Sequence, residues 1–368
     1  MIRILSPFFL LFTIAILGQN NPSTNGVHSK NKPFYVFENA VIHIDGDIII
    51  ENGTLIIQDN KITYVGNKTK LPKNSIVEDL EGKHIYPSFI ELNSNFGMKE
   101  ITKEKRSPYP QYHTNKKGPY YWNQAIKTEV DAFEYYTYDD KKAKELRKLG
   151  FGTVLSHQQD GISRGTGALV SLTDVDSKQI ISDKSSLHFA FSKGSSRQAY
   201  PSSLMGIIAL MRQYFYDSEY YKLHADEVDL NLTLQSQNEN NGLSHIIDVN
   251  DKLSILRADK LGDEFNKNYI IIGNGDEYQE ISAIKKTEAK LIVPLQFPKA
   301  YDIKDPFDAT YVTLEQLKHW ELAPANLSRL EDSAIVFSIT SSKLEKGESF
   351  LKNLRKAVQY GLSPSAAI

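Results

Sequence analysis

Cysteine is absent from this sequence, and neither sign of charge is in clear excess. Without cysteine there can be no disulfide, zinc–thiolate site, iron–sulfur cluster or cysteine nucleophile. Lys plus Arg is 43 and Asp plus Glu is 45, which gives a net charge of −2 and no basic excess for nucleic-acid binding. Any metal site must therefore use His, Asp, Glu or a modified Lys.

The chain is long enough, at 368 residues, for one large domain or two ordinary ones. Hydrophobic residues make up 40% and charged residues 24%, proportions that exclude wholesale disorder.

The N-terminus has the pattern of a secretory signal. Arg3 precedes an apolar run, Ile4 to Leu17, that ends at the small residue Gly18. That run has the length of a signal-peptide core and is short for a bilayer span, although a short N-terminal anchor helix is an alternative. We predict a signal at 1–18, a polar linker at 19–32, and an exported protein of the bacterial periplasm or extracellular space. After cleavage we expect no membrane segment.

The mature chain divides into two styles of sequence. Residues 33–85 alternate β-rich runs with turns at Asp45-Gly46, Asn52-Gly53 and Asp59-Asn60, which predicts a small antiparallel β-domain. From residue 86 to 368, apolar strands alternate with helical stretches, a pattern that predicts an α/β fold, the (β/α)8 TIM-like barrel. The predicted strands are 85–92, 151–157, 167–172, 186–191, 252–256, 268–273, 290–295 and 333–339.

Two long insertions interrupt the predicted barrel. Lys99–Tyr138 is rich in Tyr and Trp and should form a lid over the barrel mouth or an interface with a neighbouring domain. Asp226–Asp251 is predicted to be a solvated loop. At the other end Ser363 and Pro364 begin a new helix just before the sequence stops, so we expect a barrel truncated at its C-terminus, in a fragment of a longer polypeptide.

Several ordered motifs point to a known family. The strings ENGTLIIQDNKITYVGN and VEDLEGKHIYPSFIELNSNFG, within residues 35–97, resemble the opening of an amidohydrolase-superfamily enzyme. Later segments, FGTVLSHQQDGISRGTGALVSL among them, resemble the imidazolonepropionase-like branch. The resemblance implies a metal-dependent hydrolase barrel, with 33–85 as half of a composite β-sandwich. It also implies hydrolysis of non-peptide or cyclic amide C–N bonds by metal-activated water.

The resemblance also implies where metal ligands and catalytic groups should lie. The expected ligands are His residues, a carboxylate or carboxylated Lys, and an Asp on the last strand that accepts the water proton. The corresponding residues of this chain are Asn93, Asn95, Ser254, Leu256 and Asn274 for His, Lys193 for the carboxylate, and Ser341 for the Asp. Amide and apolar side chains bind zinc-class metals poorly, so we expect no cofactor in this chain, or zinc or another divalent metal if it is active.

Three other residues are candidates for ligand contact. His157 follows the second predicted strand, Glu277 keeps the acidic end of its motif, and Trp122 lies in the aromatic insertion. Each also has a structural interpretation, as a polar mouth residue or a packed aromatic.

Two functions follow from these observations. The first is a non-catalytic scaffold or binding domain, associated with a downstream amidohydrolase domain or with itself. The second is an active amidohydrolase with non-standard ligands, or one whose activity comes from a second barrel downstream.

Overall fold

The computed structural model describes residues 32–103, 113–174, 179–344 and 349–368. They divide into two compact units, one of residues 32–42 and 50–85 and the other of residues 43–49 and 86–368. The predicted signal lies outside the described residues, as does the linker except for Lys32. No helix in the described ranges combines the length and the apolar character that a membrane span requires.

The smaller unit is a five-stranded sheet around a core of Ala40, Ile42 and Leu55. Its strands are β1 (Phe34–His43), β2 (Ile49–Gln58), β3 (Lys61–Gly66), β4 (Ser75–Asp79) and β5 (His84–Ile85). Strands β2 and β3 form an antiparallel hairpin through Asp59 and Asn60, which both have positive φ as a tight hairpin turn requires.

Two predictions for this unit are wrong. The sheet is mixed rather than antiparallel, because β1 pairs in parallel with β4 and β5. The predicted turn at Asn52-Gly53 lies inside β2, where Asn52 adopts a φ of 51° without ending the strand.

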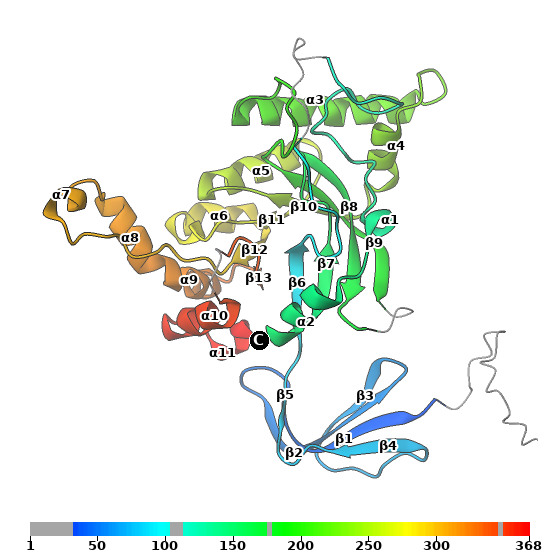
Figure 1. Cartoon of the computed structure of the whole chain (residues 1–368), viewed down its shortest axis with the longest axis vertical. Helices are drawn as coiled ribbons and strands as arrows, with labels where there is room; N and C mark the ends of the chain where they lie inside the picture. The colour runs from blue at the N-terminus through cyan, green and yellow to red at the C-terminus, as the bar shows by residue number, and fades with distance from the viewer. Residues whose placement is uncertain (1–31, 104–112, 175–178, 345–348) are drawn as a thin grey trace, which may run out of the picture. The chain divides into compact units, whose positions relative to one another are not determined.

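The larger unit contains one eight-stranded sheet, in the order β13-β12-β11-β10-β9-β8-β7-β6 (Figure 1). Its strands are β6 (Phe89–Ser94), β7 (Phe151–Ser156), β8 (Ser163–Ser171), β9 (Ile180–Ala190), β10 (Ser244–Asp248), β11 (Tyr269–Ile272), β12 (Lys290–Pro294) and β13 (Phe337–Thr340). The α/β class is therefore confirmed.

The regular (β/α)8 pattern holds only in part. Strand β8 runs antiparallel to both β7 and β9, whereas the other neighbouring pairs are parallel. Only six residues, 157–162, connect β7 to β8, too few for the crossover that parallel strands need. Among the described residues no backbone ladder joins β6 to β13, so the sheet is not closed by main-chain hydrogen bonds.

Helices cover the outer side of this sheet (Figure 1). The longer ones are α2 (Asp140–Lys148), α3 (Leu204–Leu223), α4 (Leu232–Glu239), α5 (Lys252–Glu264), α6 (Ile281–Thr287), α8 (Leu314–Leu322), α9 (Asn326–Asp332) and α10 (Phe350–Gln359). The short ones are α1 (Ala132–Tyr135), α7 (Pro306–Ala309), α11 (Pro364–Ala367) and the 3-10 turns η2 (Glu277–Gln279) and η3 (Ala323–Ala325).

The region around residue 250 differs from the prediction. The predicted strand 252–256 is the first turn of α5, because the Asp251 side chain caps it by accepting from the Ser254 amide at 2.9 Å. The predicted loop 226–251 contains α4 and strand β10. The five-residue run of β10 is short and lies between polar segments, so its alternation gave little signal.

The described part of the aromatic insertion packs into the larger unit. Tyr121 is buried and donates its hydroxyl to Asp217 of α3 at 2.6 Å, and its amide donates to Thr233 Oγ1 of α4. Ile126 and Asp131 form parallel bridges with β8. The insertion therefore holds α3 and α4 against the reversed strand.

Candidate functional site at the carboxyl ends of the strands

The carboxyl ends of parallel strands gather side chains from distant parts of the chain, so the candidate site is sought there. Glu91 of β6 is 1% exposed and faces β13. One of its oxygens accepts from the Thr340 hydroxyl and the Asn93 amide (3.0 Å), and the other from the Ser341 amide (2.7 Å) and hydroxyl (2.5 Å). Burial raises the pKa of Glu91. A carboxyl group thus bridges the seam between β6 and β13, and Ser341 serves it as a donor.

Asn93 is part of the same network. Its Nδ2 donates to Ser342 Oγ at 3.0 Å, and its Oδ1 accepts from Gln159 Nε2 at 2.9 Å. Asn95, just after β6, is exposed. Asn93 and Asn95, at positions where the resemblance implies His, therefore differ in environment. Asn93 is in a buried polar network, whereas Asn95 is on the surface.

The central feature of the site is the ammonium group of Lys343. Its Nζ lies 2.8 Å from Asp248 Oδ1, 2.9 Å from the Val249 carbonyl oxygen and 2.9 Å from the Gly273 carbonyl oxygen. Asp248 also pairs with Arg164, whose Nη1 lies 3.3 Å from Oδ2. The ammonium donates hydrogen bonds to the two carbonyl oxygens and forms an ion pair with the Asp248 carboxylate. The ends of β10, β11 and β13 thus converge on the Lys343 ammonium. We call Lys343, Asp248, Arg164 and the two backbone carbonyls the Lys343 cluster.

Two histidines lie near Arg164, the second cation that pairs with Asp248. The His157 ring is fully buried and stacks on His188 of β9, with ring centroids 3.6 Å apart and planes 8° apart. His188 Nε2 lies 2.8 Å from Ser186 Oγ, whereas neither ring nitrogen of His157 has a hydrogen-bond partner among the described residues. A Cβ at Gly167 of β8 would lie 2.6 Å from His188 Nε2, so glycine is needed there.

Both histidines are neutral at pH 7. Burial, together with His188 and Arg164, holds the pKa of His157 well below its ordinary value. Burial, with a smaller effect of Arg164, lowers the pKa of His188 to about 3. Their environment therefore suits packed, uncharged rings.

Glu277 organises the loop after β11. It is fully buried; its Oε1 accepts from the amides of Asn274 (2.7 Å) and Gly275 (3.0 Å), and its Oε2 accepts from Asn326 Nδ2 at 2.5 Å. The Asn274 side chain accepts from Gln296 at 3.1 Å. Both oxygens of Glu277 thus have partners within the protein.

Four predicted site residues lie elsewhere. Ser254 and Leu256 are on helix α5 rather than at a strand end, and the Ser254 hydroxyl donates to Asp251 at 2.8 Å. Lys193 donates to the Gln198 carbonyl at 3.0 Å. Trp122 stacks on Tyr200, with centroids 6.2 Å apart. None of these four joins the Lys343 cluster.

Sequence reasoning missed Glu91, Asp248 and Lys343. Glu91 carried a signal, since a charged residue inside an apolar strand needs buried partners. Asp248 ends a strand that was not predicted, and Lys343 lies in a polar stretch without a motif.

The donor set at the strand ends does not fit a zinc-class metal. Within the described ranges no group of three or more His, Asp or Glu side chains could hold such an ion. Around Lys343 the converging groups are the Asp248 carboxylate, two backbone carbonyls and an ammonium that would repel a cation.

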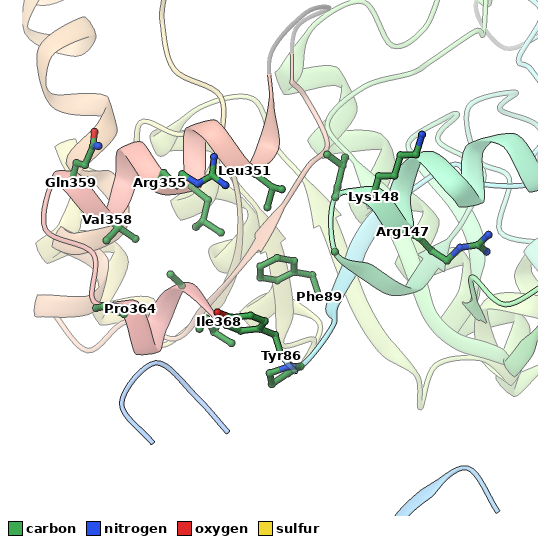
Figure 2. A pocket seen from close by; sticks show the side chains of 15 residues that line it. Tyr86, Phe89, Arg147, Lys148, Leu351, Arg355, Val358, Gln359, Pro364 and Ile368 are labelled. Atoms are coloured by element: carbon green, nitrogen blue, oxygen red, sulfur yellow. The ribbon is translucent and has the colours of Figure 1, made fainter. Parts of the chain in front are cut away.

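A cavity of about 780 Å³ lies at the amino ends of β6 and β7 (Figure 2). Its walls are mostly apolar, with Phe89, Leu351 and Val358 among them, and Arg147, Lys148 and Arg355 add positive charge. Among the described residues, those that line this cavity include no His, Asp or Glu.

Comparison with known proteins bears on the fold. No protein-family model and no curated protein matches the sequence. The structure is similar to an amidohydrolase from Thermotoga maritima MSB8, with a TM-score of 0.69 and 17% identity over 90% of this chain and 85% of that one. A Xaa-Pro dipeptidase (TM-score 0.45, 9% identity, 90% and 86% covered) and the A. niger ochratoxinase (0.43, 12%, 92% and 82%) are weaker matches and support no argument. The chain thus has an amidohydrolase-like fold.

Proposed function

We propose that this chain is an amidohydrolase-like domain that has lost metal-dependent hydrolysis and acts as a scaffold or binding domain. The observation that carries the proposal is the Lys343 ammonium, held by Asp248 and two backbone carbonyls where three strand ends converge. The fold similarity and the motifs of residues 35–97 support descent from a hydrolase that cleaves C–N bonds.

The chemistry of the cluster argues against a metal-activated water. Such a site needs imidazole or carboxylate ligands and an open coordination position. An ammonium cannot accept a water lone pair as a Lewis acid, and Lys343 is already held by two carbonyl acceptors and by the charge of Asp248.

We also propose a β-rich partner for the smaller unit, either a further segment of the same polypeptide or a second copy of this chain. Among the described strands β3 and β4 lie at the sheet edges, and Ile62, Ile76 and Val77 on them are 65%, 53% and 46% exposed. Open edges with apolar side chains favour pairing with another strand. Export to the periplasm or outside the cell stays part of this proposal and rests on residues 1–18.

Metal analysis tests the loss of hydrolysis. The purified protein, with and without added zinc, would be measured by inductively coupled plasma mass spectrometry and assayed on small N-acyl amino acids and cyclic amides. We expect neither bound metal nor turnover. Binding of about one metal equivalent that is lost in Asn93→Ala, together with hydrolysis, would establish an active enzyme with non-standard ligands.

A further inference from the structure

A second lysine lies in a cavity beside the amino ends of β10 and β11, at the opposite end of these strands from Lys343. The cavity has a volume of about 180 Å³ and is formed by α3, α4 and the segment that ends α5. Phe215 and Phe265 supply aromatic walls, and Gln237, Asn241 and Lys267 supply polar groups. It lies in the larger unit and shares no residue with the Lys343 cluster.

The Lys267 amine has few partners. Its Nζ donates to Asn241 Oδ1 at 2.5 Å and lies 5.0 Å from the centroid of the Phe215 ring. In the part of the chain that the structure describes, no carboxylate forms an ion pair with it. Burial lowers the pKa of Lys267 to about 8, with a smaller opposing effect of Glu219. A substantial fraction of this amine is therefore neutral and nucleophilic near pH 8.

The Gln237 side chain, which lines the cavity, has a buried and unpaired hydrogen-bond donor. Gln237 is 2% exposed, and its Oε1 accepts from the Tyr214 hydroxyl at 3.3 Å. Its Nε2 has no partner among the described residues. Leaving a buried amide donor unpaired costs about 1–3 kcal/mol, which a bound acceptor oxygen would recover.

We propose that this cavity binds a small aldehyde, which Lys267 converts to an imine. The Gln237 side chain turns so that its Nε2 donates to the carbonyl oxygen, while Phe215 and Phe265 contact the apolar substituent. The lone pair of Nζ forms the C–N bond as the carbonyl π electrons move to oxygen. A proton passes from nitrogen to oxygen, and the carbinolamine then loses water. Amine and aldehyde give imine and water, with no oxidant or reductant. This inference is independent of the proposed function.

Reductive trapping tests it. The intact protein would be incubated at pH 8 with butanal and cyanoborohydride, and labelled lysines would be mapped by mass spectrometry over time. Lys222 lines the same cavity and serves as an internal control. We expect Lys267 to be labelled about tenfold faster, at a rate that saturates with butanal and rises with pH around 8. A rate equal to that of Lys222, or one linear in butanal, would overturn the proposal.

A variant tests the role of the amide donor. Gln237→Leu keeps most of the side-chain volume and removes the donor, so we expect weaker saturation by butanal, with Lys267 still labelled. Unchanged saturation in a folded variant would contradict the assigned contact. If the variant does not fold, the unmodified protein is used instead, and the measurement is whether butanal protects Lys267 from acetylation by acetic anhydride. Absence of protection would count against the site.

Discussion

The regions around Lys343 and Lys267 differ in the number and kind of partners that each gives to a lysine side chain. Lys343 has a carboxylate and two carbonyl oxygens within 2.9 Å. Lys267 has one amide oxygen, an aromatic ring and an open cavity. The difference shows that the partners of a lysine, rather than its burial alone, decide its role. A cation with matched acceptors joins structural elements, whereas an under-partnered amine is available to react.

The largest expected effect concerns the two neutral histidines near Arg164. Stability should fall when the pH falls, because His188 has a folded pKa of about 3 against about 6.5 when unfolded. Between these values the unfolded state binds a proton that the folded state does not, at about 1.4 kcal/mol per pH unit. At pH 4.5 His188 alone should cost about 3 kcal/mol.

Urea unfolding between pH 4 and 7 measures this effect. His188→Gln should flatten the pH dependence while keeping a polar side chain near Ser186. The same slope in protein and variant would mean that the stacked pair does not resist protonation.

Removing the Lys343 charge tests whether this lysine stabilises the fold, as its partners suggest. Lys343→Met leaves Asp248 with Arg164 as its remaining cation, at 3.3 Å. We expect a loss of about 2 kcal/mol in the free energy of unfolding, below the 3–5 kcal/mol of a fully buried broken pair. The double variant Lys343→Met/Asp248→Asn is the control and should lose less than the sum of the two single changes. Additive losses would argue against direct coupling.

The smallest expected effect is a pH dependence of stability due to Lys267, the lysine with fewer partners. Its folded pKa of about 8 lies below the ordinary 10.5, so the unfolded state holds more protons between these values and stability should rise with pH. Partial exposure screens the effect, and we expect a gain of about 1 kcal/mol between pH 8 and 9. Lys267→Met should abolish this gain in chemical unfolding, whereas a gain that persists would assign it to another group.

Local pattern predicted much of the fold. The apolar runs of β6, β7, β11, β12 and β13 were found from the sequence. Strand β10 was not predicted, because a run of five residues between polar segments shows little periodicity. The motif positions Ser254 and Leu256 were consequently assigned to a strand, although they belong to α5.

The sequence by itself determined the α/β class, the change of style after residue 85 and the presence of Asn93 and Asn274 at positions where the resemblance implies His. Only the tertiary structure decided the reversal of β8, the seam bridged by Glu91 and the convergence of Asp248 and Lys343. The physical reason is the range of the interactions. Periodicity and capping act over a few residues, whereas the Glu91–Ser341 contact joins residues 250 positions apart.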